Sequence, residues 1–223
     1  EVFVIDDLSS GLEKNENKSA NYFHFNLMDC IQDNRKIKAI LTNHNIQTVY
    51  HLAANADISL SVSHPEKAYE INLMSSIALV NICNSCNVER FFFASTSAVY
   101  GEPNYLPVDR KHPTSPISPY GLTKLGFEQY LNYLSKTSST KFAVFRFPNV
   151  YGFRQRPDLE GGVIAIFQYA IQLNHDITIF GDGEQTRDWV DVSDIKKALY
   201  LGLSITEKFN IFLLGSNTKT SLN

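Results

Sequence analysis

An unbroken apolar run, Phe91-Phe92-Phe93-Ala94, ends in the hydroxyl residues Ser95 and Thr96. The run is too short for a helix and has no alternation of polar and apolar residues, which is typical of a parallel strand buried on both faces. Such a strand occurs in α/β proteins, where helices cover both faces of the sheet. The run therefore predicts an α/β fold with polar groups at the carboxyl end of a central strand.

The rest of the chain alternates between strand-like and helix-like stretches. Short apolar or β-branched runs predict strands at residues 2–5, 22–26, 48–52, 142–147, 177–180 and 212–214. Helical patterns occupy residues 29–44, 65–87 and 119–136, the stretch from Gly161-Gly162 to Leu173, and a segment that begins near Ser193. This order predicts a Rossmann-like, doubly wound sheet with a parallel core.

Composition excludes several classes of protein. The formal net charge of −3 gives no support for binding to nucleic acid or to a membrane surface, and no apolar run is long enough to cross a bilayer. Three cysteines form no disulfide framework, so we expect a reducing, cytoplasmic location; Cys83-x-x-Cys86 is more simply two small buried residues. The six histidines have no metal-ligand spacing, and we expect no metal site.

Tyr120 and Lys124 are the first candidate catalytic pair. Ser118 is a good N-cap and Pro119 suits the first helical position, so the two side chains are expected four residues apart on one helix face. An ammonium beside a phenol stabilises the phenolate, which predicts that the pKa of Tyr120 falls from about 10 towards neutrality. Tyr120 is therefore a candidate general base. The spacing alone carries little weight, because a surface lysine one turn from a packed tyrosine also produces it.

Asp6 follows the first predicted strand. A carboxylate at the tip of a parallel strand accepts hydrogen bonds from an adenosine ribose and repels a 2′-phosphate, which favours NAD over NADP. An aspartate that caps a turn explains this stretch equally well.

Six ordered motifs span essentially the whole chain: residues 4–11, 51–54, 95–101, 118–124, 146–152 and 181–188. Together they resemble the extended short-chain dehydrogenase/reductase family, in its NAD-dependent sugar-nucleotide epimerase/dehydratase branch. The resemblance implies an NAD-binding Rossmann domain at 1–150 and part of a smaller C-terminal substrate-binding region at 151–223. Within that region, segment 188–204 is expected to return to the Rossmann domain.

The resemblance also assigns roles to residues. Tyr120 matches the catalytic base, Lys124 the residue that lowers its pKa and holds the nicotinamide ribose, and Thr96 the residue that hydrogen-bonds the reacting sugar hydroxyl. Besides Tyr120 and Lys124, the positions that match cofactor contacts are Asp6, Asp7, Leu8, Ser9, Ser10, Gly11, Asn26, Leu27, Leu52, Ala53, Ala54, Asn72 and Pro148. The substrate positions are Thr96, Asn149, Val163, Phe180 and Arg187, of which Asn149 and Arg187 match groups that hold the nucleotide diphosphate.

The activity implied for the intact parent chain is NAD-dependent epimerisation at C4 of a UDP-hexose, of the UDP-glucose/UDP-galactose type, through a transient 4-keto sugar. Dehydratases and decarboxylases of the branch carry an acidic residue at the positions of Ser97-Ala98, which this chain lacks. A dehydratase, decarboxylase or reductase of the same scaffold remains an alternative, as does a non-catalytic NAD-binding fragment.

The resemblance implies two further properties. The family's first strand and glycine-rich phosphate-binding turn should precede Glu1, so we expect a fragment at both ends that binds NAD poorly without those backbone amides. Helices 65–87 and 119–136 match a pair that forms a four-helix bundle between two subunits, which implies a homodimer.

Overall fold

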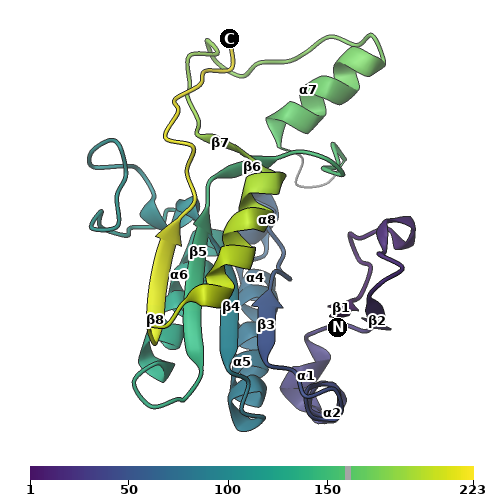
Figure 1. Ribbon diagram of the computed structural model, residues 1–223. Helices are drawn as coiled ribbons and strands as arrows, with labels where there is room; N and C mark the ends of the chain where they lie inside the picture. The colour runs from purple at the N-terminus through teal and green to yellow at the C-terminus, as the bar shows by residue number, and fades with distance from the viewer. Residues whose placement is uncertain (159–161) are drawn as a thin grey trace.

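The computed structural model describes residues 1–158 and 162–223, and its strands form three parallel groups (Figure 1). The central sheet has the spatial order β3 (Thr48–His51), β4 (Arg90–Thr96), β5 (Lys141–Phe147) and β8 (Phe209–Leu213). The two outer pairs are β1 (Phe3–Asp6) with β2 (Asn21–His24), and β6 (Asn149–Tyr151) with β7 (Trp189–Asp191). All these pairings are parallel, which confirms the predicted fold class.

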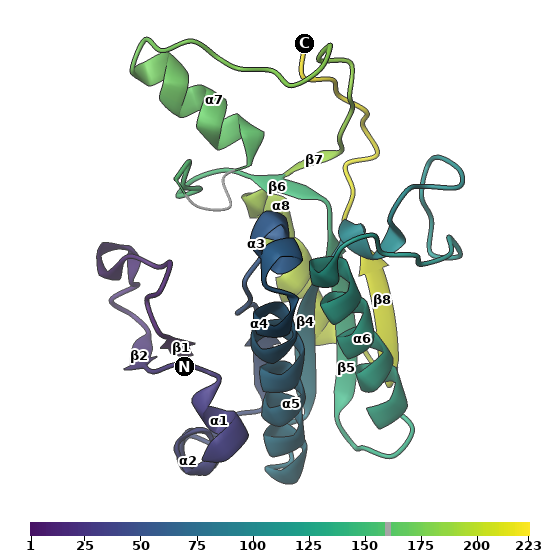
Figure 2. The same cartoon turned by 180° about the vertical axis from the view of Figure 1, so that it is seen from behind.

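Helices lie on both faces of the central sheet (Figures 1 and 2). One face carries α4 (Pro65–Ala68), α5 (Ser75–Ser85) and α6 (Pro119–Leu134), and the opposite face carries α8 (Val192–Leu201). The remaining helices are α1 (Asp29–Gln32), α2 (Arg35–Asn43), α3 (Ile58–Ser63) and α7 (Val163–Gln172). Short 3₁₀ turns occupy Glu13–Asn15, Ser97–Tyr100 and Gly202–Ser204.

The core consists of two apolar layers divided by β4 and β5. Phe91 and Phe93 face α5 and α6, where they pack with Phe127. Phe92 and Phe145 face the other side, where Leu199 of α8 covers them. Burial on both faces explains the continuous apolar run of β4 and fixes the positions of the polar residues that follow it.

Three predicted elements differ from the structure. The helix expected at 29–44 is broken into α1 and α2, because the Asp33 carboxylate accepts hydrogen bonds from the backbone N–H and the guanidinium of Arg35 and so starts a new helix. The stretch 65–87 is helical but contains a wide π-helical segment, Tyr69–Met74. No strand is formed at 177–180: these residues are exposed and, within the described chain, have no partner strand.

Two observations complete the comparison. Helix α3, which the sequence pattern did not predict, starts at an Asp57 cap whose carboxylate accepts from the Leu60 N–H at 2.8 Å. The expected start of α7 at Gly161 lies outside the described residues.

Across the described ranges, no helix has both the length and the apolar character that a membrane crossing requires.

Candidate active site

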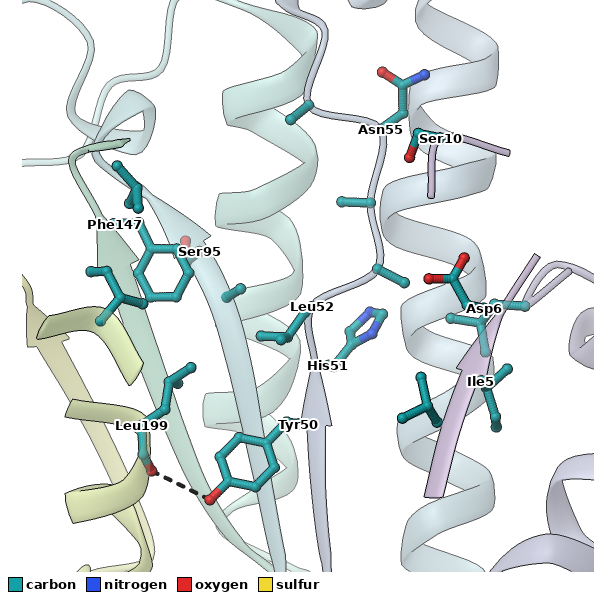
Figure 3. A pocket seen from close by; sticks show the side chains of 18 of the residues that line it. Ile5, Asp6, Ser10, Tyr50, His51, Leu52, Asn55, Ser95, Phe147 and Leu199 are labelled. Atoms are coloured by element: carbon teal, nitrogen blue, oxygen red, sulfur yellow. Dashed lines mark hydrogen bonds between the residues drawn. The ribbon is translucent and has the colours of Figure 1, made fainter. Parts of the chain in front are cut away.

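A cleft lies over the carboxyl ends of β4 and β5, where the loops that follow β1 and β3 also contribute to its lining (Figure 3). In Figure 3, Asp6 and Ser10 lie on the side of β1, and the Asn55 side chain is on the same side of the segment after β3 as Ser10. Leu52 points away from Asp6, towards the side of Phe147. Ligands of open α/β sheets bind at this edge, because the polar strand ends and the loops converge there.

Asp6 is positioned by the loop that follows β1. Its Oδ1 accepts the Leu8 N–H at 2.8 Å, and Leu8 adopts a left-handed φ of 56° that turns the chain back. A Cβ built on Gly11 would lie 3.4 and 3.5 Å from the two Asp6 carboxylate oxygens. The tightest contact of that Cβ would be with Leu8 Cδ2 at 3.2 Å, whereas both distances to the carboxylate oxygens are ordinary van der Waals contacts.

Small residues follow β3 on the opposite wall. Ala53 and Ala54 line the cleft, and Leu52 is 54% exposed there. The backbone of Asn55 is held by Asn72, whose Oδ1 accepts from the Asn55 N–H and whose Nδ2 donates to the Asn55 C=O, both at 2.8 Å. Asn72 is 1% exposed and lies behind the cleft wall, where it supports the loop; its direct cofactor contact stays a prediction.

Helix α6 presents the tyrosine and the lysine. Ser118 caps the helix by accepting the Gly121 N–H at 3.1 Å, as predicted, and the Tyr120 N–H donates to Ser61 Oγ at 3.2 Å. Lys124 is 3% exposed; its Nζ donates to the Ala94 carbonyl at 3.0 Å and lies 5.8 Å from the centre of the Tyr120 ring. A buried ammonium is thus held next to the phenol that it is expected to activate.

Thr96 ends β4 and faces the same cleft. Its Oγ1 accepts the Ala98 N–H at 3.1 Å and so caps the 3₁₀ turn Ser97–Tyr100. A hydroxyl that accepts one hydrogen bond retains its own proton as a donor. Thr96, Tyr120 and Lys124 all line the cleft. Thr96 comes from a strand and the other two from a helix, and Thr96 precedes Tyr120 by 24 residues.

The structure brings most of the predicted contact residues to this cleft. Its walls include Asp6, Asp7, Ser9, Ser10, Asn26, Leu27, Leu52, Ala53, Ala54, Thr96, Tyr120, Lys124, Pro148, Asn149, Val163 and Arg187. Leu8, Gly11, Asn72 and Phe180 are outside the lining. Leu8, Gly11 and Asn72 support lining residues from behind, whereas Phe180 is 84% exposed.

The end of the cleft above the sheet is formed by β6 and the segment before β7. Asn149 N–H donates to the Asp188 C=O at 3.2 Å, which joins the start of β6 to that segment. Arg187 forms an isolated antiparallel bridge with Thr220 and lines the cleft. The two residues expected to hold a diphosphate therefore lie on neighbouring segments.

Sequence reasoning missed two groups of residues. Arg154 and Arg156 donate to the carbonyls of Asn15 and Ser10, each at 3.0 Å, and so connect the loop after β6 to the loop after β1. Glu128 and Arg146 form a buried ion pair beneath the site. Only the spacing of Glu128, four residues beyond Lys124, could have indicated the second group.

His51 is a buried base that ends β3. Its Nε2 lies 2.7 Å from Ser76 Oγ, and burial, together with the charge of Lys124, lowers the pKa of His51 to about 3. The neutral ring packs among Phe91, Phe93 and Phe127. His51 thus remains uncharged at neutral pH.

This burial predicts a pH dependence of stability. Between pH 6.5 and about 3 the unfolded chain binds a proton at His51 that the folded chain does not bind, so stability falls as pH falls, by up to about 1.4 kcal/mol per unit. His51→Gln removes this titration. As the pH is lowered from 7 to 4, the free energy of unfolding of His51→Gln, measured in urea, should therefore increase relative to that of wild type. The exposed His64→Gln is the control, and an equal response of both variants would contradict the assignment.

Three comparisons with known proteins bear on this site. The family model described as "NAD dependent epimerase/dehydratase family" matches residues 1–215. The chain belongs to this family. Its members are enzymes whose cofactor is NAD, which confirms the resemblance drawn from the motifs and the expected cofactor.

Similar proteins are mostly epimerases. The UDP-glucose 4-epimerase of Thermotoga maritima, solved with UDP-glucose, superposes with a TM-score of 0.93 at 34% identity over 99% of this chain and 71% of its own. The UDP-N-acetylglucosamine 4-epimerase of Methanobrevibacter ruminantium gives 0.92 at 30% identity, over 99% and 70%. The UDP-glucose 4-epimerase of Mycolicibacterium smegmatis is 30% identical over 99% of this chain and 71% of its own.

Other similar proteins carry out different reactions. A structure named as an NAD-dependent NDP-hexosamine 5,6-dehydratase has a TM-score of 0.88 at 26% identity, over 100% of this chain and 69% of its own. The Escherichia coli dTDP-4-dehydro-6-deoxyglucose reductase is 30% identical over 91% and 64%. Family membership therefore fixes the fold and the cofactor but not the reaction.

The residues of the cleft fit NAD. The Asp6 carboxylate and the small side chains of Ala53 and Ala54 line the cleft, and a buried cation occurs at Lys124. Asp6 suits a ribose diol, the small side chains suit a flat ring, and Lys124 suits the hydroxyls of a second ribose.

Proposed function

We propose that this enzyme epimerises a UDP-hexose, of the UDP-glucose/UDP-galactose type, at C4 through a transient 4-keto sugar. The observation that carries the proposal is the convergence of Thr96, Tyr120 and Lys124 on one cleft, with no carboxylate at Ser97 or Ala98. The two epimerases that superpose best among the structures described above support it.

Side chains of the protein would remove the proton from O4 and later return it. Thr96 Oγ hydrogen-bonds the 4-hydroxyl, and Tyr120 Oη, as phenolate, takes its proton. Lys124 stabilises the phenolate electrostatically within a buried, low-dielectric site. Bound NAD, which Asp6 and Lys124 would hold by its two riboses, would supply a reversible hydride acceptor for C4. Tyr120 then gives its proton back to O4, so one residue acts as base and as acid.

The nucleotide part of the substrate would bind at the upper end of the cleft. Arg187 would pair with diphosphate oxygens, because its planar fork matches them, and the Asn149 amide would donate beside it. Val163 of α7 lines the same wall, and Phe180 is proposed to contact the substrate from its exposed position.

The second candidate is a sugar-nucleotide dehydratase, which the similarity to the 5,6-dehydratase favours. Water elimination needs an acid–base pair in addition to Tyr120, and Ser97-Ala98 supplies neither member. The residues at this turn therefore favour epimerisation at C4 over water elimination.

Incubation of the intact parent protein with NAD and UDP-glucose distinguishes the two. We expect UDP-galactose, identified by chromatography and NMR, with no change in mass. Loss of the mass of one water would establish the dehydratase instead. No conversion of UDP-glucose, UDP-N-acetylglucosamine or UDP-glucuronic acid would contradict both candidates.

The proposed assembly is a homodimer formed through the helical stretches 65–87 and 119–136. These helices make the outer layer on one face, and exposed apolar side chains on that layer include Tyr69, Met74, Leu122 and Tyr133. Sedimentation velocity should give twice the monomer mass, and Tyr133→Glu should shift the population to monomer. A monomeric wild-type protein at micromolar concentration would contradict the dimer.

A further inference from the structure

Helix α6 carries a further polar residue, Glu128, on the face of Tyr120 and Lys124. Glu128 follows Lys124 by four residues, so the three lie on successive turns of one helix face. Its side chain is 1% exposed, deep beneath the cleft and away from any ligand position. A carboxylate so deeply buried requires partners.

Three residues from other elements supply those partners. Arg146 Nε donates to Glu128 Oε1 at 3.0 Å, and Arg146 Nη2 donates to Oε2 at 2.5 Å. Ser95 Oγ donates to Oε1 at 2.5 Å, and Arg146 Nη1 donates to Tyr100 Oη at 2.8 Å. The Arg146 side chain is 6% exposed and its guanidinium carbon lies 4.8 Å from the centre of the Tyr100 ring, so the network is buried, with Ser95 at the lining of the cleft.

The members of this network are next to the residues that line the site. Ser95 immediately precedes Thr96 on β4, and Tyr100 ends the turn that Thr96 begins. Arg146 lies on β5 two residues before Pro148. The network thus joins α6 to β4, to β5 and to the 3₁₀ turn at the level where each presents a side chain to the cleft.

We propose that Glu128 and Arg146 are positioning residues, which hold Thr96 on β4 at the correct distance from Tyr120 and Lys124 on α6. The inference rests on the proposed function, because it assigns the network to the same proton transfer. Fixed hydrogen bonds with defined directions constrain three elements more tightly than apolar contacts, which permit small slips.

A purely stabilising role is the alternative explanation. The free-energy cost of removing both charges from water offsets the attraction between them. Replacing a buried ion pair by apolar residues of similar volume is therefore often neutral for stability. A contribution to stability therefore does not explain why this ion pair is present. A misplacement of about 1 Å at a reacting centre, in contrast, can lower the rate about 100-fold.

The double variant Glu128→Met/Arg146→Met separates the two roles. Both charges are removed together, so neither is left unpaired, and methionine fills the space flexibly. We expect a melting temperature near that of wild type, a kcat for UDP-glucose lowered about 10- to 100-fold, and a KM changed less than about threefold. Thr140→Val is the matched control: it removes a buried hydrogen bond of Thr140 to the Val88 carbonyl at the opposite end of the strands, and kcat should not change.

A second readout needs no turnover. The ionisation of Tyr120, measured in the protein without cofactor as phenolate absorbance relative to Tyr120→Phe, should shift to higher pH in the double variant because Lys124 is held less closely. Ser95→Ala and Tyr100→Phe each remove one hydroxyl from the network. Both should lower kcat by smaller factors, of about two- to tenfold.

The outcomes are separable. A folded double variant with wild-type kcat and unshifted ionisation would overturn the positioning role while leaving the proposed function intact. If the double variant does not fold, unchanged kcat in both Ser95→Ala and Tyr100→Phe would overturn it. A wild-type enzyme that does not epimerise UDP-glucose would instead refute the proposed function, and the ionisation of Tyr120 would still test the network.

Discussion

Tyr120→Phe is expected to lower kcat by about 10³- to 10⁴-fold while the protein remains folded. The phenolic oxygen is the only atom removed, and the ring still packs beside Lys124, whose Nζ is 5.8 Å from its centre. Without that oxygen no group of this helix face receives the proton from O4, and general-base catalysis of this kind contributes about 10²- to 10⁴-fold. Conversion of UDP-glucose by the purified enzyme, followed by NMR, measures the loss.

Tyr130→Phe is the matched control for this prediction. Tyr130 lies on the same helix, and its hydroxyl donates to Asn81 Oδ1 at 2.9 Å, away from the cleft. Its removal should leave kcat within about twofold of wild type. If Tyr120→Phe retained near-wild-type turnover with a normal circular dichroism spectrum, Tyr120 would not be the base.

Local signals predicted much of the fold because they are decided by neighbouring residues. Capping by Ser118 and the fixed φ of Pro119 define the start of α6 within the sequence itself, and the structure confirms this start. The Phe91–Phe93 run likewise gave β4, since only a strand covered on both faces buries three consecutive phenylalanines.

Features decided by distant contacts were not predictable. A strand at 177–180 satisfies the pattern rule, but a strand exists only where a partner completes its hydrogen bonds, and the sequence does not show which segments meet. The pairing of Glu128 with Arg146 joins residues 18 apart, and an isolated glutamate in a helix reads as a solvent-exposed charge.

The candidate site was predictable in its residues but not in its supports. The spacing indicated Tyr120 and Lys124, the family resemblance indicated Thr96, and all three line one cleft, while their roles stay predictions. The Asn72 amide holds the Asn55 backbone, a contact that the motif did not indicate, and its cofactor contact stays a prediction. A buried amide has both donors and acceptors to satisfy, and the fold rather than the motif determines which partner it meets.

Lys124→Met is expected to lower kcat at neutral pH by about 10²- to 10³-fold, a loss similar to that caused by removing one group that stabilises a developing oxyanion. Methionine retains most of the buried volume, so the packing on Phe93 is largely preserved, but the positive charge and the donor to the Ala94 carbonyl are lost. The phenolate of Tyr120 then has no cation beside it, and its formation requires a higher pH.

The pH profile distinguishes this electrostatic role from a general loss of structure. In wild type, activity should rise with pH and reach its plateau near neutrality, because the Tyr120 phenolate forms there. In Lys124→Met the rise should move towards the ordinary tyrosine pKa of about 10, so that part of the lost rate returns in alkaline buffer. The exposed Lys197→Met, which removes an ion pair with Asp194 on α8, should leave the profile unchanged. An unshifted profile in Lys124→Met would show that this ammonium does not control the ionisation of Tyr120, and the base would then have to be activated by another charge in the cleft.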